Sequence, residues 1–293
     1  MGEFDESILL DIGDPCFFSV SVCAEVRITA DVVYGHKDGM ALTYDVLTPE
    51  NPNGAGVLSM ISGAWYSVWR APRQRIGSMQ PLLNAGYTVF AVHHGSAPRF
   101  NVVEAVSDVR AAARHIVAHA VEYQVDANRL GVTGASAGGH LSLMLALNPE
   151  GKDEVPTGRR RWLGPRYESS ANTSAPLAAV VAYFPPVDMT AFMSQDERSP
   201  QLKISESEAV AISPVKYATE DDPPVLLIHG DVDKVVPIEQ SEILVKAMSQ
   251  NNMNYDLIIM EGAGHGFRGE QSDQARSAMV AWFDKHLSPT QIE

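Results

Sequence analysis

The sequence predicts an α/β fold: a mostly parallel sheet of about eight strands, with helices on both faces and a small inserted cap. Three observations predict it. Short apolar runs that are typical of buried strands alternate with helical patterns from residue 57 to the end of the chain. Two runs with strand-like alternation precede them and indicate an opening antiparallel pair. Finally, a G-x-S-x-G sequence at residues 134–138 stands between a strand pattern and a helix pattern.

Each predicted strand and helix has its own sequence signal. Residues 20–33 and 41–47 alternate apolar and polar side chains around Asp38-Gly39, which is a hairpin signal. Apolar runs predict further strands at residues 56–61, 87–92, 129–133, 177–184, 225–229 and 255–260. Helical spacing, most clearly that of Val102, Val106 and Val109, predicts helices at residues 74–85, 101–123, 139–147, 239–249 and 274–286, the first of them stopped by Gly86.

No linker, repeat or change of composition divides the chain, so we expect one domain over residues 1–293. Residues 1–20 carry little pattern and are expected to be a lead-in. Residues 148–176 are polar and rich in glycine, proline and charge, which predicts an insertion at the rim or flank of the site. Residues 188–215 are expected to form short helices that make the cap.

Composition excludes some classes of function. The 293 residues are 45% hydrophobic and 20% charged, and the net charge is −14, from 22 Lys and Arg against 36 Asp and Glu. Because phosphate binding needs clustered basic residues, neither nucleic acid nor an anionic membrane is an expected partner. The basic run at residues 159–161 is interpreted as a solvated turn, and Cys16 and Cys23 as ordinary thiols.

The location and assembly of the protein are only partly indicated. No run approaches the roughly 18 apolar residues of a membrane span, and the acidic start lacks the basic region of a signal peptide. The chain as given is therefore expected in the cytoplasm, or outside the cell if a leader was removed. Its oligomeric state is left open.

The G-A-S-A-G run at residues 134–138 predicts a nucleophile elbow centred on Ser136. Such a turn is so sharp that side chains two residues before and after the nucleophile would clash, and Gly134 and Gly138 remove them. The Ala137 amide, at the start of the following helix, would be free to donate to a developing oxyanion.

A serine hydroxyl needs a base within hydrogen-bond reach, and that base needs an orienting acid. Loops at the carboxyl ends of the strands must supply both. His265, flanked by glycines after the strand at residues 255–260, is the predicted base. Either Asp231 or Asp233, after the strand at residues 225–229, would orient it. Asp188 is a weaker alternative that more often would cap a helix.

The loop after the strand at residues 56–61 is expected to complete the oxyanion hole, through the backbone amide of Gly63 or Ala64. Trp65, Tyr66 and His94 are candidate substrate contacts, although core packing is the more frequent role of such aromatic residues. Two further histidines are assigned: His93 could flank the cleft, and His229, at a strand end, is expected to be buried and structural.

The sequence carries no H-E-x-x-H and no C-x-x-C, and its one G-x-G-x-x-G, at residues 264–269, ends five residues before the helix predicted at 274–286. No metal, nucleotide or other cofactor is therefore expected.

Taken together, these motifs resemble those of the α/β-hydrolase superfamily over the whole chain after about residue 25. The runs G-A-S-A-G-G at residues 134–139, H-G-D-V-D at 229–233 and G-H-G-F at 264–267 are similar to the esterase/lipase branch, which also includes prolyl-oligopeptidase-type domains. The resemblance implies that Asp233 is the acid. I-S-G-A-W stands at residues 61–65 where well-known esterases of this branch have H-G-G-G-W. This loop, with His-Gly-Ser at residues 94–96, resembles those of bacterial carbohydrate esterases that remove acetyl or feruloyl groups from xylan.

The sequence therefore predicts a carboxylic ester hydrolase that works through an acyl-enzyme on a small-molecule or oligosaccharide ester. Two alternatives stay open. The first is an amide-directed serine hydrolase, either a peptidase or a formamidase. The second is a binding protein of the same fold that has lost catalysis.

Overall fold

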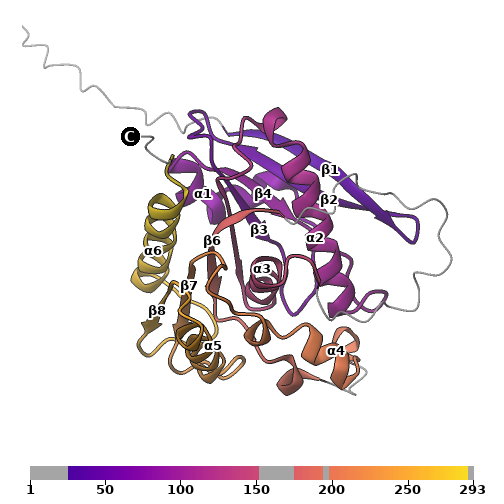
Figure 1. Cartoon of the computed structure of the whole chain (residues 1–293). Helices are drawn as coiled ribbons and strands as arrows, with labels where there is room; N and C mark the ends of the chain where they lie inside the picture. Colours follow the sequence, from indigo (N-terminus) through magenta and orange to yellow (C-terminus); the bar gives the residue numbers. More distant parts are fainter. Residues whose placement is uncertain (1–25, 152–174, 194–197, 290–293) are drawn as a thin grey trace, which may run out of the picture.

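A computed structural model describes residues 26–151, 175–193 and 198–289. They form one eight-stranded sheet in the order β1-β2-β4-β3-β5-β6-β7-β8 (Figure 1). This confirms the predicted fold class, an α/β-hydrolase sheet with helices on both faces. The predicted lead-in, both cysteines, the 159–161 basic run and most of the predicted insertion lie outside the described residues. The strands are β1 (Arg27–Lys37), β2 (Met40–Thr48), β3 (Gly56–Met60), β4 (Thr88–Val92), β5 (Leu130–Ala135), β6 (Leu177–Tyr183), β7 (Val225–Gly230) and β8 (Tyr255–Met260).

The antiparallel part of the sheet lies at its amino-terminal side. β1 and β2 form the predicted hairpin, and Asp38 and Gly39 at its tip have φ of 49° and 80°. β2 pairs antiparallel with β4, and β4, β3, β5, β6, β7 and β8 are then parallel neighbours. The carboxyl ends of β3 to β8 therefore meet at one edge of the sheet, where functional loops of such folds gather.

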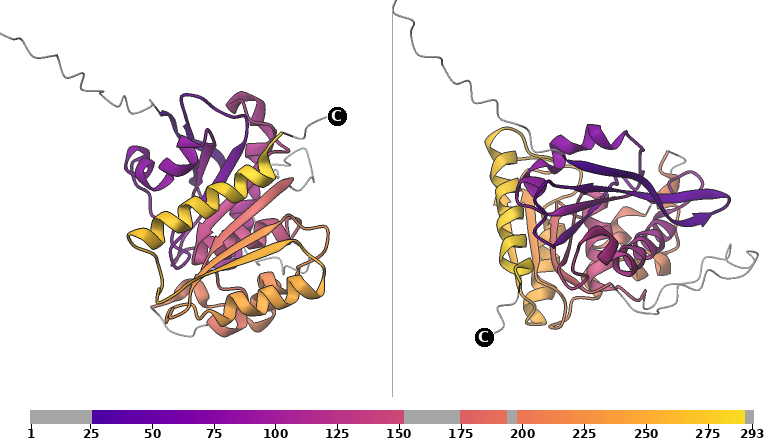
Figure 2. Two further views of the ribbon diagram at one scale, coloured as in Figure 1. Left: turned by 90° about the vertical axis from the view of Figure 1, so that its left-hand side faces the viewer. Right: turned by 90° about the horizontal axis from the view of Figure 1, so that it is seen from above.

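Helices cover both faces of the sheet and create two apolar cores (Figures 1 and 2). α1 (Ile76–Asn84) and α6 (Glu270–Leu287) lie on one face, whereas α2 (Val102–Ala118), α3 (Ala137–Leu147) and α5 (Glu239–Gln250) lie on the other. The α6 face packs tightly, because a Cβ added to Gly131 in β5 would lie 2.5 Å from the Phe283 ring. Burial of these apolar faces holds the helices against the sheet.

Several helix boundaries differ from the pattern-based prediction. α2 ends at Ala118, and a separate 3₁₀ turn at Ala120–Tyr123 completes the predicted 101–123 segment. A 3₁₀ turn at Pro72–Arg75 leads into α1. α6 begins at Glu270, four residues before the predicted start, because Glu270 and Asp273 in its first turn favour the positive end of the helix dipole. Apolar spacing does not reveal such a polar first turn.

The predicted cap consists of short helices: η4 (Met189–Phe192), η5 (Pro200–Leu202), α4 (Glu206–Ala211) and η6 (Pro214–Lys216). Asp188 caps η4 through a 3.0 Å bond from the Thr190 amide to its Oδ1, as expected for its alternative role. Ser205 and Glu208 form a capping box at the start of α4. Among the helices of the described ranges, none is both long and apolar enough to cross a bilayer.

Candidate active site

The turn between β5 and α3 has the geometry of a nucleophile elbow. Ser136 has φ 55° and ψ −120°, a conformation that costs on the order of 1–3 kcal/mol for a residue with a side chain. A Cβ on Gly134 would lie 2.4 Å from the Gly138 carbonyl, and a Cβ on Gly138 would lie 2.9 Å from the Met60 carbonyl oxygen. The two glycines are therefore required by contacts on both sides of the turn, as the sequence pattern predicts.

Ser136, His265 and Asp233 lie in one hydrogen-bonded line. The His265 Nδ1–H donates to Asp233 Oδ2 at 2.7 Å, and the Ser136 hydroxyl donates to His265 Nε2 at 2.9 Å. Since the carboxylate fixes the tautomer, Nε2 is the nitrogen free to accept a proton. The His265 side chain is 23% exposed and that of Asp233 is fully buried. Ser136 is 129 residues and Asp233 is 32 residues from His265 in the sequence, yet the three side chains are in contact.

The loop after β7 distinguishes the two candidate acids. Asp233 Oδ1 accepts the amides of Val235 and Val236 at 2.8 and 3.0 Å, which leaves Oδ2 for His265. Asp231 instead accepts the Gly262 amide at 2.7 Å and so anchors the loop that carries the base. Of the two aspartates, Asp233 is therefore the one that contacts His265.

Gly230, the last residue of β7, lets the acid loop and the base loop approach each other. A Cβ there would lie 2.2 Å from the Ala263 carbonyl oxygen, which also accepts the Val232 amide at 3.1 Å. Gly230→Ala is expected to lower both the free energy of unfolding and, by about 100-fold, kcat for an aryl ester, because a displacement of about 1 Å is enough for such a loss. Gly264→Ala is the matched control: its Cβ would meet no atom within 4 Å. Steady-state kinetics and urea unfolding of both variants test this, and equal behaviour of the two would contradict it.

The oxyanion-hole prediction needs one correction. Gly63 exchanges backbone hydrogen bonds with Tyr66, at 3.0 and 2.9 Å, so the Gly63 amide is already committed. This bridge closes a two-residue turn in which Ala64 and Trp65 both have positive φ, 47° and 59°. Within the described part of the chain, the amides of Ala64 and Ala137 have no backbone acceptor. Of the predicted donors, these two stay candidates.

Two of the three candidate substrate contacts have internal partners instead. Trp65 is 6% exposed and its indole N–H donates to His140 Nδ1 at 3.1 Å. His94 is also buried; its Nδ1–H donates to the Gly95 carbonyl and its Nε2 accepts the Ser62 hydroxyl at 2.9 Å. Burial lowers the pKa of His94 to about 4, which keeps it neutral. Trp65 and His94 therefore have a structural role, in which they hold the loop at residues 62–66, instead of the predicted contact with substrate.

Tyr66 stays at the rim of the site, His93 is not part of the cleft wall, and His229 is buried. Tyr66 is half-buried and its hydroxyl donates to Gln201 in the cap at 3.2 Å, so its ring spans the rim and the cap. His93 is buried beside Asp45 and bonded to the Ser67 hydroxyl at 3.1 Å, which removes it from the cleft wall. His229 is fully buried between Ser241 and the Val236 carbonyl, as expected.

Sequence reasoning missed Phe184 and His140. Phe184 follows β6, and its ring lies 4.6 Å from that of His265, so it packs against the base. His140 lies one turn after Ser136 and is completely buried. His140 stands in an otherwise apolar helix, and nothing in its local pattern signals that a distant tryptophan bonds to it.

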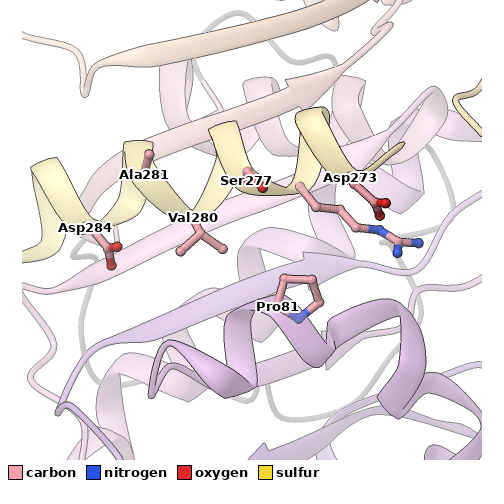
Figure 3. Close-up of a pocket in the computed structure, with 7 residues that line it drawn as sticks. Pro81, Asp273, Ser277, Val280, Ala281 and Asp284 are labelled. Carbon is pink, nitrogen blue, oxygen red and sulfur yellow. The ribbon is translucent and has the colours of Figure 1, made fainter. Parts of the chain in front are cut away.

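A groove between α1 and α6, lined by Pro81, Val280 and Asp284 among others, is a separate feature (Figure 3). It lies on the face of the sheet that α1 and α6 cover, and none of the candidate site residues lines it. No cluster of three or more His, Cys, Asp or Glu with metal-binding geometry occurs among the residues that the structure describes.

Similarity to known proteins assigns the chain to a family. The family model BD-FAE matches residues 44–248, more than half of the chain, a range that includes Ser136 and Asp233. The chain belongs to the BD-FAE family. Among curated proteins, this BD-FAE member is 28% identical over 231 residues to esterase LipC of Mycobacterium tuberculosis, covering 75% of this chain and 54% of LipC. It is also 28% identical over 210 residues to the probable carboxylic ester hydrolase LipM of the same organism, covering 67% of this chain and 45% of LipM. The chain thus spans about half the length of these relatives.

Solved structures of esterases are similar to this BD-FAE chain in fold. A truncated carbohydrate esterase from gut microbiota superimposes with a TM-score of 0.70 and 27% identity, over 90% of this chain and 97% of that one. A thermophilic esterase from the Planctomycetes species Thermogutta terrifontis gives a TM-score of 0.68 at 22% identity, over 92% and 95% of the two chains. The second likeness supports the fold alone.

Proposed function

We propose that the protein is a serine-dependent carboxylic ester hydrolase. The observation that carries this proposal is the hydrogen-bonded line from Ser136 through His265 to Asp233, with the nucleophile on a strained elbow. Membership of the BD-FAE family and the similarity to named esterases support it.

The geometry suggests the following reaction. Ser136 Oγ attacks the ester carbonyl carbon while its proton passes to His265 Nε2, and buried Asp233 stabilises the imidazolium. The Ala137 amide and the Ala64 amide donate to the oxygen that becomes negative. Collapse expels the alcohol, which takes the proton from His265 and leaves an acyl group on Ser136. A water molecule, deprotonated by His265, then releases the carboxylic acid and restores the hydroxyl.

For the substrate, we propose acetyl or feruloyl groups esterified to xylan-type carbohydrate. Support comes from the carbohydrate esterase that is 27% identical to this chain, and from the loop sequence at residues 61–65. Ala64 and His265 are exposed at the rim, so an ester on a large alcohol could approach Ser136 from solvent.

The proposal is tested by comparing kcat/KM for p-nitrophenyl acetate, p-nitroacetanilide, and acetylated and feruloylated xylo-oligosaccharides. We expect turnover of the aryl ester, little or none of the anilide, and release of acetate or ferulate from the oligosaccharides. Anilide turnover that equals ester turnover would indicate an amide-directed enzyme. Absence of turnover on every substrate would indicate a binding protein. If the enzyme hydrolyses the aryl ester but neither the acetylated nor the feruloylated oligosaccharide, the carbohydrate assignment alone would be overturned.

A further inference from the structure

His140 connects three parts of the molecule. It lies on α3, four residues after Ser136, and its backbone amide donates to the Ser136 carbonyl at 3.0 Å. Its Nδ1 accepts the Trp65 indole N–H at 3.1 Å, and its Nε2–H donates to the Ile212 carbonyl at 2.8 Å. The elbow helix, the loop at residues 62–66 and the cap thus meet on one imidazole ring.

The environment of His140 fixes its protonation state. The side chain is completely buried, and desolvation lowers its pKa to about 4. The hydrogen bond to the Ile212 carbonyl partly opposes this shift, and the positive charge of Arg110 adds a smaller lowering. A neutral ring that donates from Nε2 must accept at Nδ1, which is what the Trp65 N–H requires. A protonated ring would instead direct an N–H at the indole N–H.

The loop that His140 contacts is strained. Ala64 and Trp65 both have positive φ, and neither is glycine, so the turn needs contacts that hold it in place. The Gly63–Tyr66 bridge closes its base, and the Ser62 hydroxyl is bonded to His94 at 2.9 Å. The Trp65 side chain, at the end of the strained pair, is held by His140, against which it also packs edge-on at 5.6 Å between ring centroids.

We propose that His140 is a positioning residue for the oxyanion hole. By accepting the Trp65 N–H, it fixes the turn whose Ala64 amide donates to the developing oxyanion, and through Ile212 it joins that turn to the cap. This inference rests on the proposed function. His140 does not contact the reacting atoms; it acts through Trp65 on the direction of one amide.

If His140 only packed in the core, its substitution would change the free energy of unfolding and leave kcat unchanged. The test therefore compares substitutions of similar size. His140→Asn can keep an acceptor oxygen close to the position of Nδ1, whereas His140→Leu fills the space without one. Trp65→Phe removes the N–H donor and keeps an aromatic ring. His115→Leu on α2, which removes a 2.9 Å bond to the Tyr44 hydroxyl of β2, is the control for losing a partly buried histidine.

We expect His140→Leu to lower kcat for p-nitrophenyl acetate by about 10- to 100-fold with KM within about threefold, less than the loss of a whole oxyanion donor. Trp65→Phe should lower kcat similarly, and His140→Asn should recover most of the activity. The His140→Leu, Trp65→Phe double variant should be no worse than the poorer single variant, because both changes break one bond. His115→Leu should retain wild-type kcat.

Additive losses in the double variant, or wild-type kcat in folded His140→Leu or Trp65→Phe, would overturn the positioning role. If His140→Leu does not fold, as judged by thermal unfolding, Trp65→Phe and His140→Asn still decide the matter. Wild-type protein without esterase activity would instead be a failure of the proposed function, so the two failures are distinguishable.

Discussion

Ser136→Ala is expected to reduce kcat for p-nitrophenyl acetate by about 10⁴- to 10⁶-fold, because no acyl-enzyme can form without the nucleophilic hydroxyl. The substitution removes only Oγ, and its 2.9 Å bond to His265 is exposed, so the fold should survive. Circular dichroism and urea unfolding check that point. Retention of more than about one-hundredth of the wild-type rate would contradict the assignment of Ser136.

Ser136→Gly separates activity from strain at the same position. Glycine adopts φ 55° without a Cβ penalty, so this variant should be as inactive as Ser136→Ala. Relief of strain, set against the greater flexibility of glycine in the unfolded chain, should raise the free energy of unfolding by about 1 kcal/mol. An elbow that is less stable with glycine than with alanine would show that the backbone strain inferred here is absent.

Asp233→Asn is expected to lower kcat by about 10³- to 10⁴-fold with little change in KM. An amide in place of the carboxylate can direct an N–H at His265 Nδ1, which favours the wrong tautomer, and it cannot stabilise the imidazolium. Asp231→Asn is the matched control on the same loop. Its side-chain oxygen can still accept the Gly262 amide, so kcat should change by less than about tenfold. The reverse ranking of the two variants would assign the acid to Asp231.

Much of the candidate site could be predicted because it depends on local sterics and on topology. The glycines at 134 and 138 are demanded by the elbow itself, whatever surrounds it. His265 and the aspartate loop could be placed together because the carboxyl ends of β7 and β8 are neighbours in a parallel pair. The residues alone left Asp231 and Asp233 open, and the family resemblance implied Asp233. The backbone amides of Val235 and Val236 hold Asp233 Oδ1 and leave its Oδ2 for His265.

What could not be predicted depends on partners distant in sequence. Gly63 looked like a free amide donor, but the positive φ of the next two residues turns its N–H to Tyr66. From its sequence, Trp65 could be either a core residue or a substrate contact, and the acceptor that its indole N–H reaches lies 75 residues away. His140 itself sits in an apolar helix pattern that predicts only core packing. Such contacts arise from tertiary packing, which hydrophobic spacing does not encode.

In the proposed mechanism, one serine, Ser136, attacks the ester carbonyl with help from His265. Labelling with a fluorophosphonate, followed by peptide mass spectrometry and residual ester hydrolysis, tests it most directly. We expect one phosphonyl group per chain, on the peptide that contains Ser136, with activity lost in proportion to labelling. Activity that persists after complete labelling of Ser136, or that is lost through an adduct on another residue, would contradict it.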